Sequence, residues 1–355
     1  MKDGLAESLL AKIMQWDYDT LNHERFCIQL LADLKYNDYQ KYSQGMRYVE
    51  SLAVWLKNFD IADREIMYNF IKKNLIYISE GQMRNLVENA YSFHITPVLI
   101  DKAKYIIKNC KSGCVQSNKD LYNSIVKNTL FLGLSDGSHI DIFRRANPEL
   151  SNEQICVYYD LSKERIGDMF SSMDENNSID NTIFLLDDFS GSGISFIRKE
   201  NEKWKGKIVN FLERLKSYGI SINNIDIHIL LYVSTQNAID YINKQLKIYT
   251  NENYISKNYT ADLIQIISPI NCEKEFICLL KKYYNKYSMA KIEDIHYKKG
   301  NITEPYMGFN CGKLPIVLYH NAPNNAFPII WFDADVPAPR YRGLFPRVTR
   351  HKEEK

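Results

Sequence analysis

The chain has 355 residues, of which 45% are hydrophobic and 25% are charged, and its formal net charge is +2. This length can supply two domains with a full hydrophobic core, and a charge so close to zero gives no general indication of a nucleic-acid-binding protein. No apolar segment is long enough to cross a membrane, and the first residues do not begin a signal peptide, so we expect a cytoplasmic protein whose scattered cysteines are reduced thiols.

Residues 1–127 are predicted to form an all-helical N-terminal domain. Apolar residues recur there at the spacing of amphipathic helices, and no alternation typical of strands interrupts them. Ser79 and Gln82 have the spacing of a capping box at the start of one helix. Thr96 followed by Pro97 is typical of an N-cap with proline at the first helical position, which predicts that another helix begins there.

From residue 128 to residue 355, short apolar runs alternate with helical patterns. This alternation predicts an α/β domain with a mostly parallel sheet and helices on its faces. The runs predicted as strands are 129–134, 155–159, 183–186, 225–233, 314–319 and 329–332. Residues 250–310 fit neither pattern well, and we interpret them as an insertion, or hood, over the sheet. Ligands of parallel sheets bind beyond the carboxyl ends of the strands, so residues that follow a predicted strand are the candidates for a site.

Residues 183–195 carry the clearest functional pattern. The apolar run Ile183–Leu186 leads into two carboxylates, Asp187 and Asp188, and then into a loop of Ser and Gly, after which a helical pattern spans 194–218. Backbone N–H groups in such a loop, together with a helix N-terminus, attract phosphate. The carboxylates can accept hydrogen bonds from sugar hydroxyls or hold a divalent cation. The pattern predicts a cradle for a sugar phosphate, whose phosphate-binding residues are Ser190, Gly191, Ser192, Gly193, Ile194 and Ser195.

Other phosphate-binding motifs fit these residues less well. A dinucleotide-binding fingerprint needs a third glycine where Phe196 stands, and a P-loop needs a lysine where Ile194 stands. A phospho-acceptor site at Asp187 and Asp188 stays open as an alternative, as does a generic turn beside a core strand.

Residues 183–195 resemble the phosphoribosyl-diphosphate (PRPP) binding motif of type I phosphoribosyltransferases, in which a hydrophobic strand, an acidic pair and a small-residue loop follow one another. The resemblance implies that Asp187 and Asp188 are catalytic residues that contact the ribose hydroxyls, together with Mg²⁺ that lies between the diphosphate and those hydroxyls. It also implies that the loop wraps the 5′-phosphate. The chain departs from some purine-specific members at Gly191, where they carry an acidic general base, so the identity of any base is left open.

A second candidate loop, Leu134–His139, follows the first predicted strand. Free backbone N–H groups in a loop of small residues can bind an anion. The resemblance implies that this is the pyrophosphate loop, with Asp136 as an acid/base group or cation ligand. The residues that would bind the diphosphate are Ser135, Gly137 and Ser138, with positive charge from Arg144. The alternative is an ordinary turn followed by a solvated basic helix.

The segment 160–181 is long and polar, and it lies between the second and third predicted strands. Long loops inside compact domains are often lids. The resemblance places a mobile catalytic loop here, whose basic residues Lys163 and Arg165 would meet the diphosphate. The alternative is a surface helix followed by a disordered stretch.

A polar turn over 319–328 separates the last two predicted strands. The side-chain amides of Asn321, Asn324 and Asn325 could read the edge of a base, or they could stabilise their own turn. Together with Gly308 and Phe309, this segment resembles the C-terminal signature of a bacterial branch of phosphoribosyltransferase-like proteins found in conflict and anti-phage systems. Those proteins also carry a helical N-terminal region.

The resemblance as a whole implies a phosphoribosyltransferase-like protein that binds PRPP or the ribose phosphate of a nucleotide, as the effector of an anti-phage defence system. Its expected partners are that small molecule and a protein or nucleic acid of a defence complex, and no membrane. Two alternatives stay open, a non-catalytic module that senses a nucleotide or binds a partner, and a toxin that cleaves the glycosidic bond of nucleotides or NAD.

Overall fold

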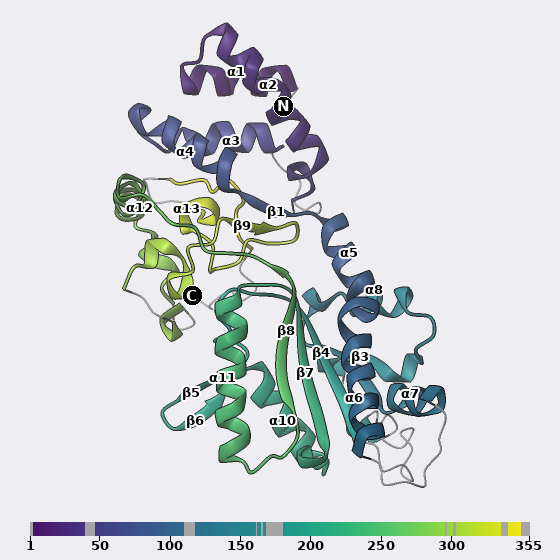
Figure 1. The fold of residues 1–355 in the computed structure, drawn as a ribbon. Coiled ribbons are helices and arrows are strands. Elements are labelled where there is room, and N and C mark those ends of the chain that lie inside the picture. The colour runs from purple at the N-terminus through teal and green to yellow at the C-terminus, as the bar shows by residue number, and fades with distance from the viewer. Residues whose placement is uncertain are drawn as a thin grey trace. The chain divides into compact units, whose positions relative to one another are not determined.

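The computed structural model describes residues 3–39, 47–109, 118–160, 162–164, 166–167, 180–294, 297–300, 303–334 and 340–348. The chain forms two compact units (Figure 1). One contains Met1–Gln82 together with Ser268–Lys355, and the other is Met83–Ile267. The predicted border at residue 127 is not a border of these units, because the helices just before it belong with the central sheet.

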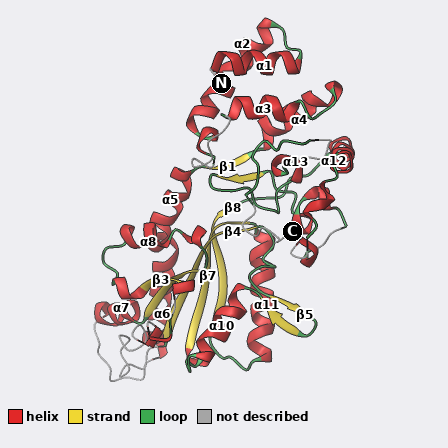
Figure 2. Ribbon diagram, turned by 180° about the vertical axis from the view of Figure 1, so that it is seen from behind, coloured by secondary structure: helices red, strands yellow, loops and turns green. Residues whose placement is uncertain are grey.

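The unit Met83–Ile267 is built on a five-stranded sheet in which all neighbouring strands are parallel, in the order β3-β2-β4-β7-β8. This arrangement confirms the predicted α/β fold with a mostly parallel sheet, and Figure 2 shows the strands side by side. The strands are β2 (Thr129–Gly133), β3 (Ile155–Val157), β4 (Asn181–Ser190), β7 (Ile225–Ser234) and β8 (Tyr259–Ile266).

Helices cover both faces of this sheet. On one face, the Lys102 ammonium group of α6 (Thr96–Asn109) donates to Thr182 Oγ1 at 2.6 Å and pairs with Asp226 Oδ2 at 2.9 Å. On the opposite face, the Asn243 side chain of α11 (Gln236–Glu252) bonds both backbone groups of Ala261, at 2.7 and 2.9 Å. The other helices of this unit are α7 (Asn118–Lys127), α8 (Ile140–Ala146) and α10 (Lys207–Ser217).

The helix α5 (Glu80–Ala90) begins as predicted. Gln82 N donates to Ser79 Oγ at 3.3 Å and Ser79 N donates to Gln82 Oε1 at 3.1 Å, which confirms the capping box. The predicted N-cap at Thr96 is wrong. A π turn, Tyr91–Ile95, joins α5 to α6, and Thr96 has helical backbone angles (φ −53°, ψ −44°). The wider π turn allows the chain to continue from α5 into α6 although Pro97 has no N–H to donate to the preceding turn.

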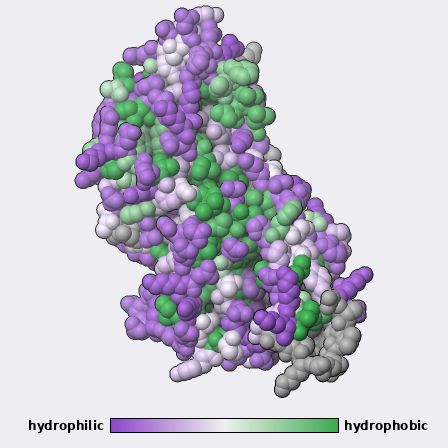
Figure 3. All heavy atoms as spheres, viewed as in Figure 1, coloured by the Kyte–Doolittle hydropathy of each residue, from purple (hydrophilic) through white to green (hydrophobic). Residues whose placement is uncertain are grey.

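The helix predicted over 194–218 is wrong in its first part. After the Ser-Gly loop the chain forms an antiparallel hairpin, β5 (Arg198–Glu200) and β6 (Lys203–Lys205), and only then does α10 begin. Figure 3 shows the region of this hairpin, at the lower left, as largely hydrophilic. The chain leaves the hairpin at Gly206. Its φ is +124°, and an added Cβ would lie 2.4 Å from Phe196 O. Only glycine tolerates this conformation and this close approach.

Strand β8 lies inside the segment 250–310 that fitted neither pattern in the sequence. It is the edge strand of the sheet and half of its residues are exposed, so its composition is polar. Residues 259–266 therefore belong to the sheet and not to an insertion over it.

The unit of Met1–Gln82 and Ser268–Lys355 is mainly helical. Its longer helices are α1 (Asp3–Met14), α2 (Tyr18–Leu34), α3 (Tyr48–Leu56), α4 (Ile61–Asn74) and α12 (Lys274–Lys286). Aromatic side chains fill its core, and Trp55 and Tyr341 are fully buried. Among the described residues, the predicted helical character of the N-terminal region is confirmed except at one place. A short strand, β1 (Ile76–Ile78), pairs in parallel with β9 (Ile316–Leu318), which confirms part of the predicted strand 314–319.

The strand predicted over 329–332 is wrong, because these residues form the short helix α13 (Pro328–Trp331). Proline at the first position favours a helix start, since its φ is already helical and its missing N–H is not needed there. Among the described residues, no helix has both the length and the apolar composition needed to cross a bilayer.

Candidate functional site

The carboxyl ends of β2 and β4 bring the acidic pair and the first candidate loop together. Gly133 at the end of β2 is in register with Leu186 of β4, and Leu134 N donates to Leu186 O at 2.9 Å. Asp187 is the next residue of β4, and Ser135, two residues beyond the end of β2, reaches it through its hydroxyl group. This is the juxtaposition expected from parallel strands whose carboxyl ends meet at one edge.

Asp187 is fully buried and both of its carboxylate oxygens have partners. Ser135 Oγ donates to Oδ1 at 2.5 Å, and the Lys207 ammonium group, at the start of α10, pairs with Oδ2. Burial raises the pKa of Asp187; the neighbouring carboxylate of Asp188 acts in the same direction, while Lys207 and Ser135 oppose the rise. This carboxylate joins three segments of the chain.

Asp188 is the more accessible member of the pair, since its side chain is only partly buried. The loop after β2 lies directly against it, because a Cβ added to Gly137 would fall 2.4 Å from Asp188 Oδ2. Glycine at this position is what allows the close approach. Asp136, one residue earlier, is exposed. Asp188 and Asp136 are thus the two carboxylates of the site with surface to offer a ligand.

The Ser-Gly loop after β4 is held in place by residues at the end of β7. Ser234 Oγ donates to Ser190 O at 2.9 Å, and Thr235 Oγ1 donates to Gly191 O at 3.1 Å. The loop also closes on itself, because Gly193 N donates to Ser190 Oγ at 3.0 Å. Gly193 has a φ of +75°, and an added Cβ would lie 2.8 Å from Ala238 O. These contacts fix the loop over the first turn of α11.

The outer part of this loop presents hydrogen-bond donors. Ser192 and Ile194 are half-buried and Ser195 is exposed. The backbone N–H groups of these three residues, and the hydroxyl groups of the two serines, have no hydrogen-bond partner among the residues that the structure describes. Unpaired N–H groups in a tight loop, such as the neighbouring ones of Ile194 and Ser195, can form a concave site for an anion. The loop therefore offers the chemistry that the sequence pattern predicts.

Two cations near this loop were not among the predicted residues. Lys207 pairs with Asp187, and Arg198 of β5 donates to Ile194 O at 3.4 Å and pairs with Glu200 at 3.2 Å. Both positions lie within 194–218, where the sequence predicts one continuous helix. The one available signal was Gly206, which interrupts the helical pattern directly before Lys207.

The other predicted phosphate ligands are less closely associated with the acidic pair. Ser138 is buried and its backbone carbonyl accepts from Tyr232 Oη at 2.8 Å. Arg144 is exposed in the last turn of α8. Lys163 is exposed, and Arg165 lies outside the described residues together with most of the predicted lid.

The asparagines proposed to read a base lie in the unit of Met1–Gln82 and Ser268–Lys355. Asn321 Nδ2 donates to Val348 O at 3.0 Å, and its Oδ1 accepts from Ala322 N at 2.9 Å. Asn325 is buried and its Nδ2 donates to Phe309 O at 3.1 Å. The backbone carbonyl of Asn324 accepts from Phe309 N at 2.8 Å. The amides of Asn321 and Asn325 are engaged within the fold, and both donate to backbone carbonyls outside their own turn.

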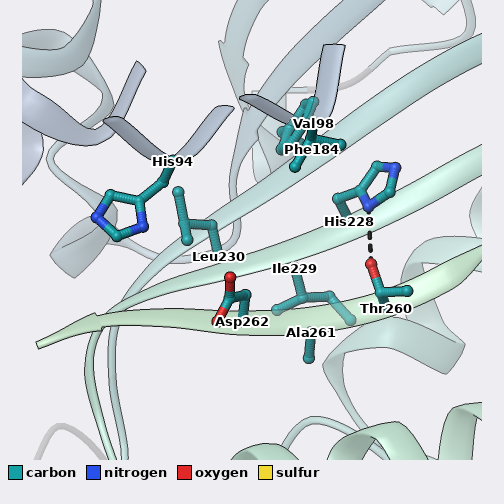
Figure 4. Close-up of a pocket in the computed structure, with 9 residues that line it drawn as sticks. All are labelled: His94, Val98, Phe184, His228, Ile229, Leu230, Thr260, Ala261 and Asp262. Atoms are coloured by element: carbon teal, nitrogen blue, oxygen red, sulfur yellow. Dashed lines mark hydrogen bonds between the residues drawn. The ribbon is translucent and has the colours of Figure 1, made fainter. Parts of the chain in front are cut away.

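A separate pocket of about 180 Å³ lies on the face of the sheet that α6 covers (Figure 4). The ring of His228 stacks on Phe184 with ring centroids 5.0 Å apart, and its Nδ1 lies 2.7 Å from Thr260 Oγ1. Burial lowers the pKa of His228 to about 4. None of the residues predicted to bind a ligand lines this pocket.

Comparison with known protein families places the chain in one of them. The model of a family described as PRTase-CE matches residues 52–347, well over half of the chain. The matched range includes both candidate loops, the acidic pair and the segment of Asn321–Asn325. No curated protein matches the chain.

Proposed function

Because the chain belongs to the PRTase-CE family of phosphoribosyltransferase-like proteins, we propose that it binds PRPP, or the ribose phosphate of a nucleotide, at the carboxyl ends of β2 and β4. The observation that carries this proposal is the loop after β4. Its three outer N–H groups have no partner among the described residues, and they follow an acidic pair on a largely buried strand. A phosphate beside a sugar diol is the ligand that this combination suits.

Each part of the ligand has a proposed contact. The 5′-phosphate would lie on the loop Ser190–Ser195, and the diphosphate of PRPP on the loop Ser135–Ser138. The ribose hydroxyls would donate to Asp188, which has accessible surface. Asp187 would act indirectly, because its oxygens already hold Ser135 and Lys207.

Mg²⁺ fits this site as an ion that the ligand brings with it. Mg²⁺ is commonly held by one or two carboxylates together with substrate phosphates and water, and Asp188 and Asp136 are the carboxylates with accessible surface here. Among the described residues there is no cluster of three or more acidic, His or Cys side chains that would form a cage by itself. When bound, the ion would neutralise charge on the diphosphate.

The reaction that such a site would support is displacement of the diphosphate at the anomeric carbon, through an oxocarbenium-like state. The chain's contribution would be to position the ligand and to stabilise the charge of the departing group. Lacking a carboxylate at Gly191, the loop supplies no general base of its own. This absence favours a second candidate function, a module that binds the nucleotide without turnover.

Binding is tested by isothermal titration of the full chain with PRPP and Mg²⁺. We expect saturable binding that Asp188→Asn weakens by roughly tenfold or more, because the ribose loses a charged acceptor. Asp101→Asn is the matched control, since Asp101 is an exposed aspartate on α6 whose partner is Lys104. The proposal fails if PRPP, ribose 5-phosphate and nucleoside monophosphates all show no binding to the wild-type chain.

Turnover separates the two candidate functions. Incubation with PRPP and a panel of nucleobases, and separately with nucleotides and NAD, would be analysed by mass spectrometry. A new nucleotide indicates a transferase, and a free base indicates cleavage of the glycosidic bond. Tight binding without product over hours indicates the binding module.

We also propose that the protein acts as the effector of a bacterial anti-phage system, which rests on the resemblance of the segment around 308–331 to that branch. The test compares phage infection of cells that express the wild-type chain or Asp188→Asn, together with the neighbouring genes. Loss of protection, or of toxicity, in the variant alone supports this role. Equal survival of both strains without any protection contradicts it.

A further inference from the structure

Lys207 occupies a position that does not favour its helix. It is the first residue of α10, and its N-cap is Gly206, which provides no side-chain cap. A positive charge in the first turn of a helix is electrostatically unfavourable, because the N-terminus of the helix dipole is itself positive. A residue whose type is unfavourable for its local structure often has a role in a functional site.

The ion pair between Lys207 and Asp187 is asymmetric. The Asp187 side chain is 0% exposed, whereas the Lys207 side chain is 36% exposed. The carboxylate is therefore enclosed by the fold, while the side chain of its partner is partly exposed. The Lys207 Nζ also lies 4.9 Å from the centroid of the Phe196 ring, which limits the positions the side chain can take. The Lys207 side chain is therefore restrained by Asp187 and Phe196, and part of its surface is still exposed.

Lys207 stands between the two loops proposed to bind phosphate groups. Its backbone N–H donates to Ser195 O at 3.0 Å, in the loop after β4. Its ammonium group shares the Asp187 carboxylate with Ser135, in the loop after β2. An anionic oxygen bound by either loop would lie close to this ammonium group.

We propose that Lys207 is a substrate-contacting residue, which donates a charge-assisted hydrogen bond to an anionic phosphate oxygen of the ribose-phosphate ligand, and that Asp187 is the positioning residue that aims it. This inference rests on the proposed function, since it assigns a further contact to the same ligand. It also accounts for the fully buried carboxylate: a buried ion pair contributes little net stability, whereas a lysine fixed at a phosphate site contributes affinity.

The test measures the affinity of the full chain for three ligands, namely PRPP with Mg²⁺, ribose 5-phosphate, and ribose. In Lys207→Met we expect binding of the charged ligands to weaken about 10- to 100-fold, because a charge-assisted hydrogen bond is lost. A loss for both phosphorylated ligands assigns the contact to the 5′-phosphate, and a loss for PRPP alone assigns it to the diphosphate. Binding of ribose should not change.

Lys205→Met is the matched control. Lys205 is two residues away, its side chain is 43% exposed, and it pairs with Glu200 at 3.1 Å. Like Lys207 it is partly exposed and pairs with a carboxylate, but its partner is a partly exposed carboxylate outside the acidic pair. The affinity of this variant should remain within about twofold of the wild type.

A double variant separates substrate contact from a structural role. Lys207→Met alone leaves a buried carboxylate without its cation, so its melting temperature should fall. Asp187→Asn with Lys207→Met removes both charges and should recover much of that loss, since neutral replacement of a buried pair is often tolerated. We expect the affinity for phosphorylated ligands to stay low in the double variant. Lys207→Arg should retain more affinity than Lys207→Met.

The outcomes distinguish this inference from the proposed function. If the double variant recovers both stability and affinity, or if Lys207→Met binds as the wild type does, Lys207 is structural and the inference is overturned while the proposed function stands. If the wild-type chain binds none of the phosphorylated ligands, both are overturned.

Discussion

The backbone amide of Lys207 donates to the carbonyl oxygen of Ser195 at 3.0 Å, across the whole length of the β5–β6 hairpin. The next residue repeats the pattern, because Ile208 N donates to Phe196 O at 3.0 Å. The start of α10 is thus bonded directly to the loop after β4. The hairpin extends from this junction without separating the helix from the site.

Gly193 is predicted to be the glycine of the loop that matters most for stability. Its φ is +75°, and an added Cβ would lie 2.8 Å from both Ala238 O and Ile242 Cγ1. Gly193→Ala combines left-handed strain with a collision in a packed region, so we expect a loss of about 2–4 kcal/mol in the free energy of unfolding. Chemical denaturation followed by circular dichroism measures it.

The matched control for this substitution is Gly219→Ala. Gly219 has a similar φ of +85°, but nothing lies within 4 Å of an added Cβ. Gly219→Ala should lower the free energy of unfolding by only about 1–2 kcal/mol, because it adds backbone strain but no collision. Equal losses in the two variants would show that the packing of the loop on α11 contributes nothing.

Gly137→Ala should affect binding more than stability. The φ of Gly137 is not in the left-handed region, but the added Cβ would lie 2.4 Å from Asp188 Oδ2. The Asp188 carboxylate must then move away from the position in which it would accept from the ribose. Affinity for PRPP should fall by roughly tenfold or more, since a displaced charged acceptor loses its hydrogen bond, while the melting temperature changes little.

Gly81→Ala is the control for this binding measurement. Gly81 lies in α5 and has nothing within 4 Å of an added Cβ. Its substitution should leave the affinity unchanged and raise the helix stability slightly. Unchanged affinity in Gly137→Ala would contradict the assignment of Asp188 to the ribose.

The elements that the sequence predicts correctly are those in which local pattern and tertiary environment agree. The residues Ile183–Leu186 form a buried central strand and show the continuous apolar run of one. Ser79 and Gln82 satisfy each other within four residues, so no distant contact decides their geometry. Parallel pairing of β2 with β4 brings the loop that contains Ser135 and the acidic pair to the same edge of the sheet.

Several of the elements that it misses depend on partners far along the chain. The edge strand β8 has an exposed, polar composition, and its strand geometry comes from its register with β7. The strand β1 exists because Ile76–Ile78 pair with Ile316–Leu318. Lys207 was hidden because residues 194–218 keep a helical spacing of apolar side chains, although Phe196 and Ile197 enter the core from a loop. A local pattern of apolar residues does not show that a hairpin interrupts the segment and brings Lys207 back to the loop after β4.

Trp55 anchors the core of the unit of Met1–Gln82 and Ser268–Lys355. Its Nε1 donates to Ile329 O at 2.7 Å and lies 3.0 Å from Tyr341 Oη, and its side chain is fully buried. Trp55→Phe removes a buried donor and leaves a void, so we expect a loss of about 2–4 kcal/mol in the free energy of unfolding. Differential scanning calorimetry measures the shift.

The same substitution at Trp204 is the control. Trp204 also donates through Nε1, to Glu252 Oε2 at 2.8 Å, but this bond is exposed to solvent. Trp204→Phe should cost less than about 1 kcal/mol, because water replaces the lost partner. Comparable losses would mean that burial of the Trp55 bond has no special value.

His228 should make the unit Met83–Ile267 less stable in mild acid. Burial lowers the pKa of His228 to about 4, whereas the unfolded chain titrates near 6.5. Above about pH 6.5 the ring is neutral in both states and contributes nothing. As the pH falls from there towards 4, only the unfolded chain gains the proton, so the free energy of unfolding falls, by at most about 3 kcal/mol. Nuclear magnetic resonance of the imidazole ring should show a titration midpoint near 4.

Two variants separate the causes of this shift. His228→Phe extends the aromatic stack of Phe184 across the sheet and removes the titrating group, so it should abolish this part of the acid sensitivity. Thr260→Val removes the partner of Nδ1 but leaves the ring buried. Because burial is the principal cause, the midpoint should remain low in this variant. A wild-type midpoint near 6.5, or an acid sensitivity that His228→Phe leaves intact, would show that the ring is solvated and that the pocket beside it is wet.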